Sequence, residues 1–254
     1  MIFYFSGCGN SKYVAETIAA GLNDNLTFIP EAAREGHYDY TLAEGERLGF
    51  VFPIYSWAPP RLVLDFAKKL QLKAKPDYLY FACTCGDNCG LTEKVFRKSV
   101  EEKGWSLSAC FSVQMPETYI GMAGFKLDTP ENAKLKIDKA NDLLKRNITR
   151  LINKKHFSEM VVGSLAWLKT YLVNPGFNRS ATDDSKYHVT EACIHCGKCV
   201  EACPLKNITL EEGRPKWHGH CTMCMGCYHH CPVNAIQYGK ATAGKGQYYF
   251  GIKG

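Results

Sequence analysis

The chain has 254 residues, of which 46% are hydrophobic and 22% charged, and its formal net charge is +6. These proportions exclude collagen-like, disordered and membrane-spanning proteins, and the length suffices for one full core and a second, smaller domain. The thirteen cysteines follow the spacing of metal ligands, which argues against a secreted disulfide scaffold.

Apolar runs alternate with helical patterns from residue 1 to about residue 120. This alternation predicts a parallel sheet with helices on both faces. The opening strand, Met1–Phe5, has no charged n-region and runs straight into a glycine loop, so it is not a signal peptide. Further strands are expected at Leu26–Ile29, Leu48–Ile54, Tyr78–Cys83 and Leu107–Val113, and helices at Ser11–Leu22, Pro60–Leu70 and Leu91–Lys103.

A longer helix is expected to close the first domain at about residue 153. Thr129 is its predicted N-cap, and Pro130 suits the first helical turn. One apolar stripe at helical period follows, which predicts a helix packed on the sheet through that face. The stripe consists of Ala133, Ile137, Ala140, Leu144, Ile148 and Leu151.

The rest of the chain divides into three expected parts. Residues 154–185 form a connector, in which Met160–Val173 is apolar enough for a buried helix and Asn174-Pro175-Gly176 should break it. Residues 186–240 form a cysteine-dense domain, and residues 241–254 form a C-terminal tail without a motif.

Two cysteine runs of the form C-x₂-C-x₂-C-x₃-C-P recur at a distance of 28 residues, which indicates an internal duplication. This spacing is typical of a bacterial-type domain with two [4Fe–4S] clusters, in which the fourth cysteine of each run ligates the other cluster. One cluster is therefore assigned to Cys193, Cys196, Cys199 and Cys231. The other is assigned to Cys221, Cys224, Cys227 and Cys203.

The competing interpretation of these cysteines is a pair of zinc sites. Zinc favours two C-x₂-C pairs well apart in the sequence, which two runs of three closely spaced cysteines fit poorly. With eight thiols present, the nearby histidines are not needed as ligands and are expected at the surface. These histidines are His195, His220, His229 and His230.

The first strand is followed by Ser6-Gly7-Cys8-Gly9-Asn10-Ser11 and then by a helix. A strand, a glycine loop and a helix N-terminus together offer backbone N–H groups and a helix dipole to a phosphate. The loop lacks the lysine of a Walker A motif, so a terminal monophosphate suits it better. The alternative is a plain turn with no ligand.

Two further loops follow later strands, at the strand ends where open α/β sheets bind ligands. Tyr55 and Trp57 can stack on a flat ring, and the backbone near Gly86 can bond its polar edge. Alternatively, Trp57 is a core aromatic and the second loop a simple turn. The candidate ligand residues are Pro53, Tyr55, Ser56 and Trp57 in one loop, and Thr84, Cys85, Gly86, Asp87, Asn88 and Gly90 in the other.

The loop from Ser6 to Ser11 resembles the flavodoxin phosphate loop, with cysteine where threonine is common, and Cys85-Gly86-Asp87 resembles the flavodoxin loop that holds the isoalloxazine. With the two cysteine runs, the chain is similar to flavodoxin–ferredoxin fusion proteins over about residues 1–153 and 186–240. The resemblance implies FMN, a doubly wound α/β sheet in the flavodoxin order 2-1-3-4-5, a small α+β ferredoxin domain, and electron transfer.

The resulting hypothesis is a relay of single electrons between two [4Fe–4S] clusters and FMN. A second hypothesis is an FMN-dependent reductase of a small quinone or nitro acceptor, with Tyr55 or Tyr119 supplying a proton; a third is an oxygen or redox sensor. Whether the chain is an enzyme stays open. Expected partners are a ferredoxin or a ferredoxin-dependent oxidoreductase, in a cytoplasmic and anaerobic setting without a membrane span.

The positive formal charge is expected to balance bound cofactors. A cubane on four thiolates carries roughly −2, and a flavin phosphate roughly −2, so the loaded protein is near neutral and no nucleic acid partner is expected. Five further cysteines lie outside the two runs. Three of them, Cys83, Cys85 and Cys89, raise the hypothesis of a redox-active thiol pair, against ordinary buried cysteines as the simpler alternative.

Overall fold

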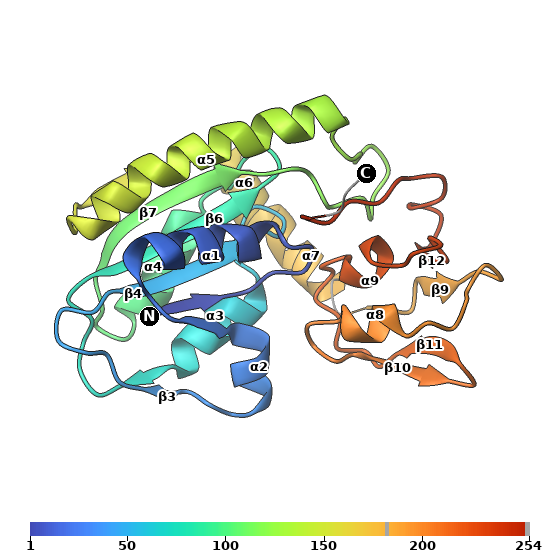
Figure 1. Ribbon diagram of the computed structural model, residues 1–254, viewed down its shortest axis with the longest axis horizontal. Coiled ribbons are helices and arrows are strands. Elements are labelled where there is room, and N and C mark those ends of the chain that lie inside the picture. Colours follow the sequence, from blue (N-terminus) through green and yellow to red (C-terminus); the bar gives the residue numbers. More distant parts are fainter. Residues whose placement is uncertain (181–182, 252–254) are drawn as a thin grey trace.

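The computed structural model describes residues 1–180 and 183–251. Residues 181–182 of the expected connector and 252–254 of the expected tail lie outside the described residues. The chain forms a larger α/β lobe and a smaller lobe of short helices and strands that carries the two cysteine runs (Figure 1).

The larger lobe is built on a parallel sheet in the order β2-β1-β4-β6-β7-β8. The first five of these strands lie where the sequence predicted strands, and their order is 2-1-3-4-5, so the predicted flavodoxin-like fold is confirmed. Helices cover both faces, which explains why the strands read as continuous apolar runs. The bounds are β1 (Ile2–Tyr4), β2 (Leu26–Phe28), β4 (Leu48–Pro53), β6 (Leu79–Cys85) and β7 (Leu107–Gln114).

A sixth strand, β8 (Phe157–Glu159), pairs in parallel with β7 and comes from the segment expected to be a connector. The sequence missed it because three residues carry no readable alternation. The expected strand Leu26–Ile29 ends one residue early, because Pro30 begins the short helix α2 (Ile29–Arg34). Two further short strands, β3 (Asp39–Tyr40) and β5 (Gln71–Leu72), pair at the edge of the lobe.

Helices α1 (Asn10–Leu22) and α5 (Pro130–Ile152) pack on one face of the sheet, and α3 (Arg61–Lys69) and α4 (Thr92–Glu101) pack on the other. Thr129 caps α5 as predicted, since its hydroxyl accepts a hydrogen bond from the Asn132 N–H at 3.3 Å. The predicted stripe faces the sheet, with Ala140, Leu144 and Leu151 buried.

The connector carries a continuous helical run made of α6 (Ala166–Leu168), a π-helical turn η1 (Lys169–Val173) and α7 (Asn174–Ser180). The prediction of a buried helix that stops at Asn174 is wrong in both respects. The run passes through Pro175, because the wider π turn directly before it relieves the clash that a proline ring makes with the preceding turn. Its apolar side chains, among them Trp167 and Leu172, are exposed.

The smaller lobe lies at one end of the parallel sheet, shown in orange and red in Figure 1. Strand β9 (Tyr187–Val189) pairs with β12 (Ile236–Tyr238), and β10 (Ile208–Glu211) forms a hairpin with β11 (Arg214–Trp217). Each cysteine run contains one short helix, α8 (Lys198–Glu201) and α9 (Gly226–His229). Across the part of the chain that the structure describes, every helix is too short or too polar to cross a bilayer.

Candidate cofactor sites

The duplication of the cysteine runs extends to their backbone conformation. Left-handed residues recur 28 positions apart, so both copies bend at the same three points. Non-glycine residues adopt this conformation at a cost, which makes the repetition a requirement of the loops and not an accident. The pairs are His195 with Met223, Gly197 with Met225, and Lys206 with Asn234.

Two small cavities in this lobe are each lined by four cysteines. The structure brings together the two sets that the spacing predicted, including the exchanged fourth cysteine of each run. We call them the outer and the inner cysteine set. The outer set is Cys193, Cys196, Cys199 and Cys231, and the inner set is Cys203, Cys221, Cys224 and Cys227.

Backbone N–H groups point at several of these sulfurs. The Asn207 N–H donates to Cys203 Sγ at 3.3 Å, and the Ala235 N–H donates to Cys231 Sγ at 3.2 Å, again 28 residues apart. Such bonds stabilise thiolates and help to set a cluster's reduction potential. The donor set therefore fits two iron–sulfur clusters.

The geometry fits zinc less well. A zinc ion needs its ligands around one point, whereas a cubane takes each thiolate on a separate iron. Within residues 1–180 and 183–251, no three His, Cys, Asp or Glu side chains are placed to hold a single metal ion.

The histidines near the cysteines differ in their surroundings. His195 and His220 are exposed as expected, but His229 is only 1% exposed, so the surface prediction is wrong for it. Its Nε2 donates to the Thr118 carbonyl at 2.7 Å, and its Nδ1 accepts from the Tyr248 N–H at 3.2 Å. Burial lowers the pKa of His229 to about 4, which keeps the ring neutral and able to link the two lobes.

A pocket of about 580 Å³ lies between the two lobes, at the carboxyl ends of the parallel strands. It is lined by all three predicted loops, and fourteen of the sixteen predicted ligand residues contribute to it. Gly9 and Gly90 lie outside this lining. The contributing residues are Ser6, Gly7, Cys8, Asn10, Ser11, Pro53, Tyr55, Ser56, Trp57, Thr84, Cys85, Gly86, Asp87 and Asn88.

The glycines of the Ser6–Ser11 loop serve a purpose that the sequence did not reveal. A Cβ on Gly7 would overlap the Cβ of Cys224, and a Cβ on Gly9 would lie 2.9 Å from the Cβ of Phe250. Gly9 also has φ +93, which strongly favours glycine. These glycines admit the smaller lobe and the C-terminal tail, in addition to leaving the loop backbone bare.

The Ser56–Trp57 pair forms a strained turn at the pocket. Both residues have positive φ, 49 and 64, and Tyr55 and Ala58 exchange two backbone hydrogen bonds across them. This is the geometry of a type I′ turn, which normally selects Asn-Gly. A strained turn of this kind persists where surrounding contacts hold it in place, as they do at binding sites.

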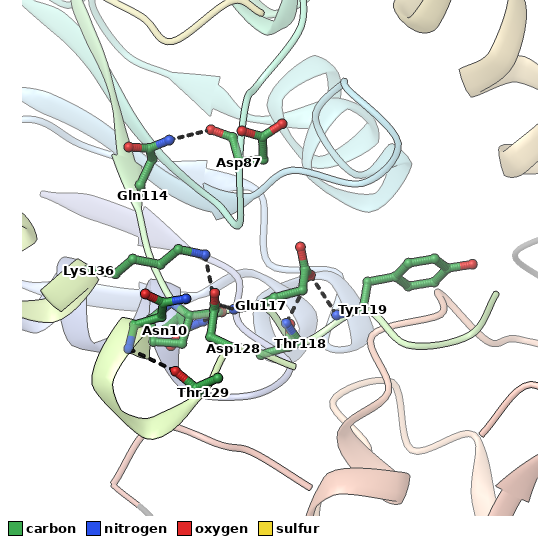
Figure 2. Close-up of polar contacts among 11 residues, drawn as sticks. Asn10, Asp87, Gln114, Glu117, Thr118, Tyr119, Asp128, Thr129 and Lys136 are labelled. Atoms are coloured by element: carbon green, nitrogen blue, oxygen red, sulfur yellow. Dashed lines mark hydrogen bonds and ion pairs between the residues drawn. The ribbon is translucent and has the colours of Figure 1, made fainter. Parts of the chain in front are cut away.

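The loop after β7, Met115–Tyr119, is a fourth wall of the pocket, of which the sequence suggested Tyr119 alone. Asn10 Nδ2 donates to the Pro116 carbonyl at 2.8 Å, and the Glu117 N–H donates to Asp128, which also pairs with Lys136 at 2.7 Å (Figure 2). The signal was available, because this loop follows the next strand on the same edge of the sheet.

Glu117 is the ionisable group that this loop adds to the pocket. Its carboxylate accepts from the backbone N–H groups of Thr118 and Tyr119 at 2.9 and 2.8 Å, as Figure 2 shows. Burial raises the pKa of Glu117 above its ordinary value. A partly desolvated carboxyl beside Gly86 is thus available to hold or release a proton at the pocket.

The five cysteines outside the two sets are all buried. Cys8 donates to the Cys224 carbonyl at 3.1 Å, and Cys89 donates to the Val161 carbonyl at 3.2 Å. Burial raises the pKa of Cys83, whereas its hydrogen bond to Cys89 lowers the pKa of Cys89. Both thiols lie in the hydrophobic core, so their placement agrees with the simpler interpretation of packed cysteines.

Comparisons with known proteins agree with the smaller lobe. Residues 192–236 match the family model described as a 4Fe-4S dicluster domain. The chain is also 39% identical over 69 residues to a ferredoxin of Pyrobaculum islandicum, a match that covers 24% of this chain. The chain spans 64% of that relative's length.

Solved structures with a weak overall similarity cover just over half of this chain. An azoreductase of Bacillus anthracis has a TM-score of 0.37 and 10% identity, covering 59% of this chain and 99% of its own. The Trp repressor binding protein of Bacillus subtilis has a TM-score of 0.33 and 16% identity, and the match covers 57% of this chain and 97% of its own. The family match thus covers residues 192–236, the stretch that contains both cysteine runs.

The pocket yields a first testable prediction. Replacing Trp57 by alanine should weaken FMN binding by about 1–3 kcal/mol, because an aromatic ring stacked on a flat ligand contributes roughly this much. Isothermal titration of the flavin-free protein would measure the change. Trp167→Ala is the matched control, since Trp167 is exposed and lies outside the pocket lining. Equal affinities in both variants would contradict the stacking.

Proposed function

We propose that the chain is an electron-transfer protein that relays single electrons between two [4Fe–4S] clusters and one FMN. The observation that carries the proposal is the position of Cys224, which belongs to the inner cysteine set and also lines the pocket between the lobes. When bound, the clusters exchange single electrons and the flavin accepts one or two. Joining both sites in one chain fixes their effective concentration.

The residues around the pocket divide the binding of FMN between them. The Ser6–Ser11 loop and the N-terminus of α1 would hold the phosphate, through backbone N–H groups and the helix dipole. The Tyr55–Trp57 turn and the Thr84–Asn88 loop would hold the ring from two sides. Burial raises the pKa of Tyr55 well above its ordinary value, so its phenol stays protonated as a donor.

The two cysteine sets differ in exposure, which indicates where electrons would enter the relay. Cys196 of the outer set is exposed, whereas Cys224 of the inner set packs against the core of the larger lobe. An external ferredoxin or ferredoxin-dependent oxidoreductase would therefore meet the outer cluster first. In this proposal, residues 1–153 are the FMN domain, 186–240 the cluster domain, 154–185 the connector and 241–254 the C-terminal tail.

One observation also favours the reductase hypothesis. The pocket extends past the predicted loops to a wall of aromatic side chains. There the ring of Tyr119 packs edge to face against Phe125 and Phe177, with ring centroids 5.2 and 6.1 Å apart. A flat quinone or nitro compound suits such a wall. Glu117 and Tyr119 are the groups placed to supply a proton there.

The relay predicts that flavin reduction is intramolecular. After mixing with excess reduced ferredoxin in an anaerobic stopped-flow instrument, the flavin phase that follows cluster reduction should have a rate independent of the chain's concentration. A reductase would in addition turn over a small acceptor with saturation. An oxygen sensor would show no rapid exchange between clusters and flavin, and a flavin phase proportional to chain concentration would refute the relay.

A further inference from the structure

The helical run from Ala166 to Ser180 has an inverted polarity. Thr170 and Asn174, which are polar, are 4% and 7% exposed, whereas Leu165 and Trp167 are 69% and 62% exposed. An ordinary surface helix does the opposite and turns its apolar stripe to the core. The outward apolar side chains therefore need an explanation other than folding of the isolated chain.

Specific hydrogen bonds hold the helix in this orientation. Thr170 Oγ1 donates to the Trp57 carbonyl at 2.9 Å and accepts from the Leu91 N–H at 3.0 Å. Asn174 Nδ2 donates to the Tyr55 carbonyl at 3.0 Å. The polar side chains thus satisfy backbone groups of the pocket loops, and rotating the helix to bury its apolar side would leave those groups unpaired.

The exposed apolar side chains of this segment fall within residues 161–173, and we call them together the outer apolar face. It holds eight of the fourteen large hydrophobic side chains that are exposed within the described residues. Such a concentration marks an interaction site, whereas scattered surface hydrophobics need no explanation. The face consists of Val161, Val162, Leu165, Trp167, Leu168, Tyr171, Leu172 and Val173.

The charges of the segment identify the kind of surface that covers this face. Between Met160 and Ser180 the sequence contains two charged residues, Lys169 and Arg179, both basic, and no acidic residue. Trp167 and Tyr171 lie side by side, with ring centroids 6.0 Å apart. Lys169 lies over the Trp57 ring, 5.1 Å from its centroid, which leaves exposed Arg179 as the basic side chain beside the outer apolar face. A basic side chain next to leucine, tryptophan and tyrosine is typical of segments that rest in the interface of an anionic bilayer.

We propose that the outer apolar face binds an anionic lipid surface. Leu165, Trp167 and Leu172 would enter the boundary of the acyl chains, while exposed Arg179 would meet the headgroups. The same helical run also walls the pocket through Gly176 and Phe177, so a chain bound in this way holds its pocket at the membrane surface. This adds a location to the proposed electron transfer and does not depend on it.

Vesicle sedimentation tests the proposal with the full chain. We expect the wild-type protein to bind vesicles of phosphatidylcholine and phosphatidylglycerol about tenfold more strongly than pure phosphatidylcholine vesicles. The double variant Leu165→Ser and Leu172→Ser should lose this binding about tenfold or more. The matched control, Leu135→Ser and Ile152→Ser, removes two exposed hydrophobics from α5, 51% and 49% exposed against 69% and 58% for Leu165 and Leu172, and should bind like the wild type.

Tryptophan fluorescence provides a second measurement of the same binding. The blue shift of tryptophan emission on adding anionic vesicles should disappear in Trp167→Phe. Unchanged iron content in each variant would show that its fold is intact. Wild-type protein that stays in the supernatant, or equal binding by both double variants, would overturn the proposal. A wild-type dimer that Leu165→Ser and Leu172→Ser converts to monomer, without vesicle binding, would assign the face to a second copy instead.

Discussion

Replacing Cys203 by serine is expected to remove the cluster whose other three ligands lie in the second cysteine run, although Cys203 belongs to the first. In the structure Cys203 lines one cavity with Cys221, Cys224 and Cys227, while the other three cysteines of its own run line the other. Iron and sulfide should fall from about eight to about four per chain, since each cubane holds four of each. Anaerobic reconstitution followed by iron and sulfide analysis measures this.

The identity of the lost cluster is the sharper part of this test. Cys203→Ser should remove the EPR signal of the cluster nearer the pocket, and Cys231→Ser should remove the other signal with the same loss of iron. Cys110→Ser, a buried cysteine outside both sets, should keep all the iron. Loss of the cluster held by Cys193, Cys196 and Cys199 in Cys203→Ser would mean that each run holds its own cluster. Stoichiometric zinc without sulfide would reject both clusters.

Local patterns predicted most of the fold and both cysteine sets. The continuous apolar strands, the Thr129 cap and the 28-residue repeat are all properties of short stretches, and the structure repeats them in its sheet order and its loop conformations. The exchange of Cys203 and Cys231 was also accessible, because the position of the fourth cysteine determines which cavity it can reach.

Features that depend on contacts between residues far apart in the sequence could not be predicted from local patterns. The apolar composition of Met160–Val173 predicted burial, but the hydrogen bonds of Thr170 and Asn174 to the Trp57 and Tyr55 carbonyls set the opposite orientation. A sequence pattern reports how apolar a segment is, and not which partner its polar residues find. Strand β8 was not predicted for a related reason, since its three residues form a strand only by pairing with β7.

The contact between the lobes has the same long-range character, and it gives the Ser6–Ser11 loop a double role. One side of the loop faces the pocket, and the other receives Cys224, whose carbonyl accepts a hydrogen bond from Cys8. Further bonds hold the lobes together, from His229 to Thr118 and from Lys245 to Ile120. The Ser6–Ser11 loop and the inner cysteine set are therefore packed as one unit.

Replacing Gly7 by alanine is expected to disturb both sites at once through this packing. The added methyl group would overlap the Cβ of Cys224 and crowd its Sγ, at 3.1 Å. Because such an overlap must be relieved, we expect the smaller lobe to shift and the free energy of unfolding to fall by about 1–3 kcal/mol. The rate of flavin reduction by the clusters should drop, and the EPR signal of the inner cluster should change while the outer one stays as it is.

The control adds the same methyl group to the same pocket without a collision. Gly176 lines the pocket from α7, and a Cβ there meets nothing within 4 Å, so Gly176→Ala should keep the wild-type EPR spectrum and flavin reduction rate. Thermal unfolding and stopped-flow measurements on the two variants isolate the effect of the contact between Gly7 and Cys224. If Gly7→Ala loses FMN but keeps an unchanged inner cluster and rate after FMN is restored in excess, the loop serves the phosphate alone. The electrons must then take a route that avoids this contact.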